Sequence, residues 1–315
     1  MNKLLLAVLL CLATSVRAQI DPNTIYGDDD RLDLYQVKDT KVLALADSTV
    51  ALFEASKVTL DGATAKLAVS SYGADMGLCK EERFYEQKNG AFCSGFLVAP
   101  DIMASAGHCV TSDESCASVR FVFGFGIKGD GGTPESVPAS EVYSCAKLLG
   151  RLQDGTGADW SLSKLDRPVT GHKPLSLSKT AINNGDPVFV IGHPAGLPTK
   201  VAGGATVRDA SNPGFFRTNT DTYGGNSGSA VFNAKSGLVE GILVRGEMDY
   251  EQKGDCRVSK VCPIDGCRGE DVTKVSAWAG NIPAPGATRV AQVGALPEFV
   301  AKLNSGAAVT FDSAR

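Results

Sequence analysis

Residues 92–109 read FCSGFLVAPDIMASAGHC, a stretch that joins a predicted strand to a histidine. The apolar run Phe92–Ala99 predicts a buried strand that ends at a proline. His108 follows a second short apolar segment, and Cys93 and Cys109 flank it at a spacing of sixteen residues. A disulfide between these cysteines would fasten the histidine loop to the strand. His108 is therefore well placed to act as a general base, although a lone histidine can also be purely structural.

A glycine-rich turn at residues 224–229, GGNSGS, offers a nucleophile for such a base. Its small residues would expose the hydroxyl of Ser227, which needs a base and an oxyanion site because free serine is a poor nucleophile. The N–H groups of Gly225 and Ser227 could converge on that oxyanion. Similar turns occur in ordinary hairpins, and the nucleophile turn of α/β-hydrolases requires glycine where this chain has Ser229. The turn alone therefore leaves a structural role open.

Asp159 is the candidate for the third member of a triad. It opens the run DWSLSKL, whose apolar positions predict a buried strand. An aspartate there could be a simple loop cap. Its place after His108 and before Ser227 favours a carboxylate that orients the base. The other histidines are expected to be loop residues, His193 in a Gly-His-Pro turn and His172 in a solvated linker.

Short strand signals recur along the chain, separated by clusters of Gly, Pro, Asn and Asp. With 35 glycines in 315 residues, this pattern favours an all-β fold, a barrel or a sandwich with one late helix. The polar, cysteine-bearing segment 247–280 is predicted to be an insertion loop. The predicted strands are 42–45, 49–54, 66–70, 91–99, 119–125, 159–165, 187–191, 200–207, 229–233, 239–244 and 288–293, and the predicted helix is 297–303.

Three ordered blocks carry a resemblance to a known family: FCSGFLVAPDIMASAGHC, ADWSLSKLDRP and TDTYGGNSGSAVF. They resemble the signatures of chymotrypsin-like (trypsin-fold) serine endopeptidases, and the serine turn looks most like the bacterial glutamyl endopeptidase branch. PGATRV, at residues 285–290, is similar to the family's last strand. The resemblance implies an all-β fold of two six-stranded antiparallel β-barrels of the trypsin type with a short C-terminal helix. The roles it implies are His108 as general base, Asp159 as its partner, Ser227 as nucleophile, and Gly225 and Ser227 as oxyanion donors.

Two positions depart from the family's pattern. Most animal members have aspartate immediately before the serine, where it receives the amine freed by zymogen cleavage, and this chain has Asn226. The cysteine usually found four residues before the serine is Tyr223 here. The pattern therefore lacks the activation ion pair and the disulfide that braces the specificity pocket.

The resemblance places the floor of the specificity pocket at Asp221, six residues before the serine. A buried carboxylate there would favour Arg or Lys on the acyl side of the cleaved bond. The Glu-preferring branch has a histidine where this chain has Leu243, and Arg245 could supply a positive charge or neutralise Asp221. We predict a preference for Arg or Lys, with Glu as the alternative. The expected substrate-binding residues are Asp221, Thr222, Val244, Arg245 and Gly246.

Residues 1–18 are typical of a secretory signal peptide, with Lys3, a short apolar run and small residues before the cleavage point. We expect a protein secreted to the extracellular space or the periplasm. The predicted organisation is a signal peptide at 1–18, a short propeptide at 19–24, a protease domain at 25–306 and a tail at 307–315. The barrels are expected at about 25–167 and 175–296.

Removing the signal leaves eight cysteines, an even number that predicts disulfides in an exported protein. The close spacing of the last three raises a zinc site as an alternative, but the chain has no C-x-x-C pair and no histidine near them. Besides Cys93–Cys109, the other six cysteines allow 15 connectivities. Among these we favour Cys116–Cys145, with Cys79 joined to a cysteine within 256–267.

The formal net charge of −4 and the absence of a basic run do not indicate binding to nucleic acid or to an anionic membrane. We expect protein or peptide substrates, a monomer, and no metal or other cofactor. The alternative function is a protease-like, non-catalytic binding protein. Such proteins usually lose a triad member, whereas this chain retains all three.

Overall fold

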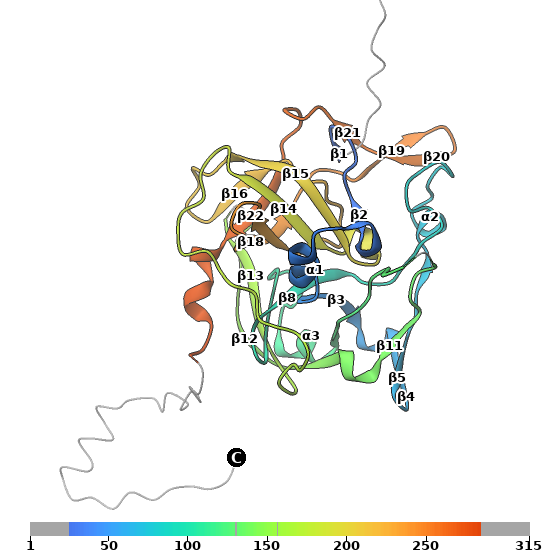
Figure 1. Cartoon of the computed structure of the whole chain (residues 1–315), viewed down its shortest axis with the longest axis vertical. Helices are drawn as coiled ribbons and strands as arrows, with labels where there is room; N and C mark the ends of the chain where they lie inside the picture. Colours follow the sequence, from blue (N-terminus) through green and yellow to red (C-terminus); the bar gives the residue numbers. More distant parts are fainter. Residues whose placement is uncertain (1–24, 130, 156, 285–315) are drawn as a thin grey trace, which may run out of the picture. The chain divides into compact units, whose positions relative to one another are not determined.

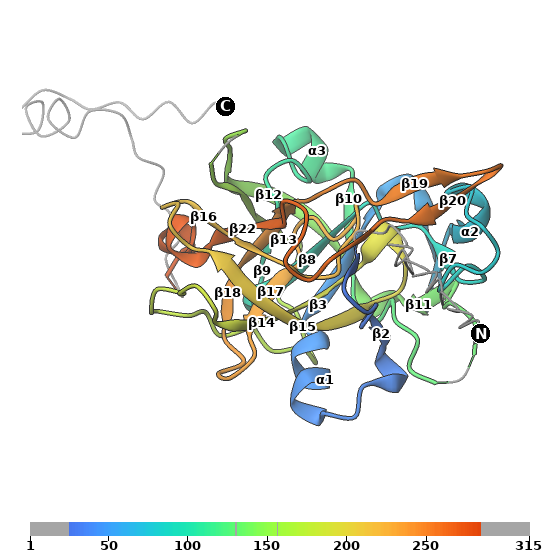
Figure 2. The same ribbon diagram turned by 90° about the horizontal axis from the view of Figure 1, so that it is seen from above.

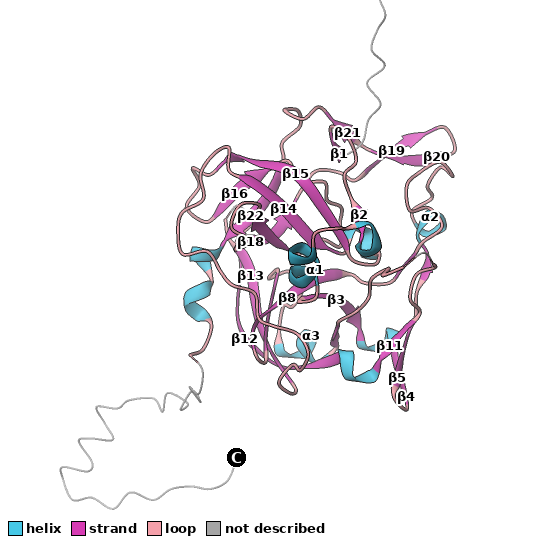
Figure 3. Ribbon diagram, viewed as in Figure 1, coloured by secondary structure: helices cyan, strands magenta, loops and turns pink. Residues whose placement is uncertain are grey.

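The computed structural model describes residues 25–129, 131–155 and 157–284, which fold mainly as strands with short helices (Figure 3). No helix among them is long and apolar enough to cross a bilayer. The strand predicted at 288–293 and the helix predicted at 297–303 lie outside the described residues. The helices are α1 (Thr40–Ala46), α2 (Tyr72–Asp75), α3 (Asp113–Ala117) and the 3-10 turns η1 (Leu34–Gln36), η2 (Ala55–Lys57), η3 (Ala139–Glu141), η4 (Pro194–Gly196), η5 (Val275–Ala277) and η6 (Ala279–Asn281).

Six antiparallel strands close the first barrel in the order β10–β12–β13–β9–β8–β3, and these strands are labelled in Figure 2. The strand β9 carries the chain from the predicted strand 91–99 towards His108. It pairs with β13 so that Ser105 lies opposite Ser161, which puts the approach to His108 beside the strand that Asp159 opens. The six strands are β3 (Thr49–Glu54), β8 (Cys93–Ala99), β9 (Ile102–Ser105), β10 (Val119–Val122), β12 (Val142–Gln153) and β13 (Asp159–Leu165).

The second barrel closes because β14 pairs antiparallel with both β15 and β17. Its order is β14–β17–β18–β22–β16–β15, and β2 (Leu32–Asp33) adds to β15 from outside. The predicted class, all-β with two six-stranded antiparallel barrels, is confirmed. The strands are β14 (Pro187–Gly192), β15 (Lys200–Asp209), β16 (Phe215–Thr218), β17 (Ala230–Asn233), β18 (Val239–Arg245) and β22 (Glu270–Lys274).

The sequence predicted that residues 247–280 form an insertion loop. The strand β22 shows that part of this segment belongs to the second barrel instead. It pairs with β16 and with β18, and it completes the barrel without the strand expected at 288–293. The strand was missed because its polar side chains are buried: Glu270, Asp271 and Thr273 are at most 3% exposed. A buried strand with this composition shows no apolar run.

The strand predicted at residues 42–45 is also wrong, because these residues belong to α1. The side chain of Asp39 accepts a hydrogen bond from the N–H of Lys41 at 2.8 Å and caps the helix. The following residues, TKVLALA, are mostly good helix formers. A run of four apolar residues does not distinguish a strand from a short helix.

The part of the insertion before β22 forms small sheets that lie beside the N-terminal residues of the described chain. The hairpin of β19 (Tyr250–Lys253) and β20 (Cys256–Ser259) lies next to α2 in both ribbon views (Figures 1 and 2). The strand β21 (Val261–Cys262) pairs in parallel with β1 (Ile25–Tyr26). The remaining sheets are β4 (Val58–Asp61) with β5 (Thr64–Leu67) and β11 (Ser136–Pro138), and β6 (Ser70–Ser71) with β7 (Lys88–Asn89).

Four disulfides join the eight cysteines of the described chain. Cys93 is bonded to Cys109 and Cys116 to Cys145, both within the first barrel. Cys79 is bonded to Cys256, and Cys262 to Cys267. The sulfurs of the last three cysteines are therefore all in disulfides, which leaves no thiolates for the alternative zinc site.

The hydrophobic core continues from one barrel to the other. Phe96 on β8 and Ile191 on β14 belong to one buried cluster. Trp278, just after η5, packs edge-on against Phe96 with 6.0 Å between ring centroids. Because both rings are fully buried, this contact holds the chain that follows β22 against the first barrel.

Candidate active site

His108 and Asp159 meet at the end of the first barrel that faces the second. The Nδ1 atom of His108 lies 2.8 Å from Oδ2 of Asp159, and Oδ1 of Asp159 accepts the N–H groups of Gly107 at 2.5 Å and His108 at 3.2 Å. The His108 side chain is one-third exposed, whereas the Asp159 carboxylate is buried. On the other side, the N–H of Asp159 donates to the hydroxyl of Thr273 on β22. A carboxylate held this way fixes the imidazole with Nε2 directed away from it.

The serine turn belongs to the second barrel but is bonded to β8 of the first. The N–H of Ser94 donates to the carbonyl of Ser227 at 2.8 Å, and the Ser94 hydroxyl donates to the carbonyl of Gly225 at 2.8 Å. The Sγ atom of Cys109 lies 3.6 Å from the same Ser227 carbonyl. Ser227 therefore lies beside the disulfide that flanks His108, and the three candidate residues come from both barrels.

The backbone around Ser227 leaves two donors for an oxyanion. Within the described chain, the N–H groups of Gly225 and Ser227 donate to no protein acceptor. Gly225 has φ +94°, and an added Cβ would lie 2.7 Å from the His193 carbonyl and from the Gly196 N–H. Glycine is required here because a side chain would be strained and would collide with the turn at η4. The geometry is thus suited to binding a carbonyl oxygen beside the serine.

The other two histidines lie in protein surroundings. His193 is buried, its Nδ1 is 2.9 Å from the Leu197 carbonyl, and burial lowers its pKa to about 4. The expectation of a solvated His172 is wrong: its ring stacks on Phe123 at 4.2 Å. Its nitrogens lie 2.9 Å from Asp47 and 2.7 Å from Glu141. These partners come from separate segments of the chain, so the local sequence of the linker does not reveal them.

Comparison with known families agrees with this architecture. Residues 93–242 match the family model described as "Trypsin-like peptidase domain". This segment is therefore similar in sequence to trypsin-like peptidase domains. A glutamyl endopeptidase from Bacillus licheniformis is 29% identical over 155 residues, which is 46% of this chain and 46% of that protein. The chain thus matches about half the length of this curated relative.

Solved structures with a similar fold include two peptidases. One is a Glu endopeptidase in complex with MPD, with 17% identity, coverage of 82% of this chain and 97% of that chain, and a TM-score of 0.46. Another is the active form of a protease from M. tuberculosis, with 16% identity, coverage of 90% of this chain and 96% of that chain, and a TM-score of 0.46.

A cavity of about 180 Å³ opens beside Ser227. Four of the five residues predicted to bind substrate line it, namely Thr222, Val244, Arg245 and Gly246. Asp221 does not line it. Its carboxylate accepts the N–H groups of Tyr26 at 2.8 Å and Asp30 at 3.2 Å, and so faces the N-terminal residues instead of the cavity. The structure thus corrects the prediction that Asp221 forms the pocket floor, because the side chain direction depends on a segment almost 200 residues away.

Glu270, which sequence reasoning missed, supplies a carboxyl group to this cavity. The segment around it was assigned to the insertion, so no family position was compared with it. The sequence suggested that Arg245 could neutralise Asp221, but its guanidinium group has other partners. Its Nε lies 3.2 Å from Asp271 and its Nη2 donates to the Gly157 carbonyl at 2.6 Å.

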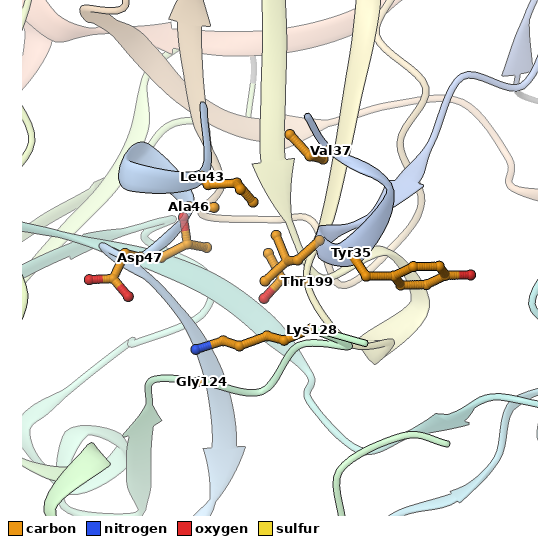
Figure 4. Close-up of a pocket in the computed structure, with 10 residues that line it drawn as sticks. Tyr35, Val37, Leu43, Ala46, Asp47, Gly124, Lys128 and Thr199 are labelled. Atoms are coloured by element: carbon orange, nitrogen blue, oxygen red, sulfur yellow. The ribbon is translucent and has the colours of Figure 1, made fainter. Parts of the chain in front are cut away.

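A larger cavity of about 420 Å³ lies away from the candidate catalytic residues, none of which lines it. Figure 4 shows side chains of α1 and of the segment before it around this cavity, with Thr199 between them and Lys128 below. Its lining mixes apolar groups such as Leu43 with charged Asp47 and Lys128. This cavity therefore plays no part in the chemistry considered for His108, Asp159 and Ser227.

Proposed function

We propose that the protein is a secreted serine endopeptidase that hydrolyses peptide bonds through an acyl-enzyme, with a preference for Arg or Lys on the acyl side. The observation that carries the proposal is the His108–Asp159 pair at 2.8 Å beside a serine turn bonded to the same barrel. In that turn, the N–H groups of Gly225 and Ser227 have no acceptor in the described chain, which supports an oxyanion site.

In this mechanism, Ser227 Oγ attacks the scissile carbonyl while His108 takes its proton. Asp159 stabilises the imidazolium and keeps its tautomer and orientation. The N–H groups of Gly225 and Ser227 stabilise the oxyanion of the tetrahedral intermediate. His108 then protonates the leaving amine, and water hydrolyses the acyl-enzyme by the same steps.

Secretion is proposed from the signal-like residues 1–18, with 19–24 as a short propeptide. The four disulfides support this, because such bonds persist in oxidising compartments. The competing specificity is for Glu, which the name of the Bacillus relative, a glutamyl endopeptidase, suggests. The acidic residues lining the cavity, Glu247, Asp249 and Glu270, count against Glu because like charges repel.

The test is labelling with a fluorophosphonate, which reacts with an activated serine. We expect label on Ser227 and hydrolysis of a denatured protein substrate, both abolished in Ser227→Ala with an unchanged melting temperature. The loss in kcat should be at least about 10⁴-fold. An unlabelled, inactive wild-type protein would favour the non-catalytic binding protein, and activity retained in Ser227→Ala would reject the nucleophile.

A further inference from the structure

We infer that Glu270 selects the substrate residue on the acyl side of the cleaved bond, and that this residue is Lys or Arg; this rests on the proposed function. Glu270 is the first residue of β22 and lines the same cavity as Ser227. The nucleophile and the carboxyl group are therefore two walls of one pocket of about 180 Å³. A side chain that enters it from a bond at Ser227 meets this carboxyl group.

Among the described residues, the donors to the Glu270 carboxyl group are uncharged. Oε2 accepts the hydroxyl of Thr222 at 2.9 Å, and Oε1 accepts the hydroxyl of Tyr26 at 3.2 Å and the N–H of Glu247 at 3.3 Å. Glu270 is only 3% exposed. Burial without a cationic partner raises the pKa of this group to about 8. The carboxyl group is thus oriented by neutral donors but lacks a countercharge.

The other residues of the cavity do not provide that countercharge. Among the described residues that line it, Arg245 is the one with a cationic side chain, and it is paired with Asp271. The other charged side chains are carboxylic: Asp249 accepts the N–H of Gly224 at 2.7 Å, and Glu247 lies 3.5 Å from Lys260. A substrate ammonium or guanidinium would compensate the buried carboxylate, whereas a substrate carboxylate would add to the negative charge.

The shape of the cavity also suits a long cationic side chain. An added Cβ on Gly246 would lie 1.8 Å from Oε2 of Glu270, so glycine at this position is required for the carboxyl group to approach this wall of the cavity. Leu243 and Val244 line the cavity with apolar surface. Such walls pack against the methylene stem of Lys or Arg while its charged end reaches a carboxylate.

The experiment measures kcat/KM for peptides that differ only at the acyl-side residue: Lys, Arg, Met and Glu. We expect the wild-type enzyme to prefer Lys and Arg over Met by about 100-fold, the size of a charged hydrogen bond in a buried site. In Glu270→Gln this preference should fall to a few-fold while the Met peptide is still cleaved. Retained cleavage of the Met peptide shows that the triad still works.

The matched control is Asp221→Asn, which changes the carboxyl group outside the cavity. We expect it to retain the preference for Lys and Arg. The inference is overturned if the wild-type enzyme prefers Glu, or if Asp221→Asn and not Glu270→Gln abolishes the preference. Fluorophosphonate labelling separates a failure of this inference from a failure of the proposed function. An enzyme that is labelled but shows no preference for Lys and Arg refutes only the role of Glu270.

A second measurement uses the wild-type enzyme, in case Glu270→Gln does not fold. Benzamidine, an aryl amidinium cation, should inhibit more strongly than neutral benzamide, and its Ki should decrease about tenfold from pH 7 to 9 as Glu270 ionises. The described charged or titratable groups around Glu270 are the Tyr26 hydroxyl, Arg208 stacked on the Tyr26 ring, Glu247, Asp249 and, in the same cavity, Arg245. Asp249 has its pKa raised by burial to about 6, below this range. Equal inhibition by the two compounds would overturn the inference.

Discussion

Asp159 and Asp221 are similarly buried, at 3% and 4% exposed, but their carboxylates face different parts of the molecule. The Asp159 carboxylate faces His108 and two backbone N–H groups of the first barrel. The Asp221 carboxylate faces the N–H groups of Tyr26 and Asp30 in the N-terminal residues of the described chain. The comparison teaches that burial and residue type do not define the role of an aspartate. The direction of its side chain does.

The surroundings of Asp221 are those of an anchor. We define residues 25–33 as the N-terminal segment. Arg31, in its middle, is fully buried, pairs with Asp29 at 2.8 Å, and lies 4.2 Å from the centre of the Tyr223 ring. Tyr223 stands four residues before Ser227, where the related family has a bracing cysteine. The N-terminal segment is thus packed against the serine loop by a cation–π contact at that position.

Asp159→Asn should have the largest effect, a fall in kcat of about 10⁴-fold, because an amide no longer holds the required tautomer of His108. The melting temperature should change little. The matched substitution Asp221→Asn should leave kcat within about threefold. Steady-state kinetics on one Lys peptide compares the two variants. Equal losses would contradict the division of roles between the two aspartates.

Arg31→Met should have the next largest effect, on stability instead of chemistry. It leaves Asp29 without the guanidinium that binds both its carboxylate oxygens, and we expect a loss of about 3 kcal/mol in the free energy of unfolding. Urea unfolding measures it. The control is Lys66→Met, which removes an exposed pair with Asp61 and should cost at most about 1 kcal/mol. Similar losses in both variants would show that Arg31 is not an anchor.

Asp30→Asn should give the smallest effect, visible only as a pH dependence. Burial raises the pKa of both Asp30 and Asp221, whose side chains are hydrogen-bonded to each other. The folded state therefore binds more protons than the unfolded state, so the stability from this pair is present at acid pH and is lost as pH rises through the raised pKa values. From about pH 4 to about pH 8, the wild-type melting temperature should fall by about 2–4 °C relative to Asp30→Asn. Thermal unfolding of both proteins across this pH range measures the effect. Plots of melting temperature against pH that stay parallel for the two proteins would contradict the prediction.

Local patterns predicted the parts of the site that depend on neighbouring residues. Three segments could be predicted because each is built from contiguous apolar or small residues: the strand β8, the turn that follows it and the serine turn. The segments missed were those whose character depends on distant partners. Residues 42–45 became helical through the Asp39 cap, and β22 buried its polar side chains between β16 and β18.

By itself, the sequence determined the all-β class, the order of His108, Asp159 and Ser227, and an even set of cysteines, because motif order and alternation are local properties. Only the tertiary structure decided which carboxyl group lines the cavity. Asp221 turns towards the N–H groups of Tyr26 and Asp30, and Glu270 takes the place beside Gly246. The physical reason is that a buried carboxyl group points to its hydrogen-bond donors, and here those donors come from segments far apart in the chain.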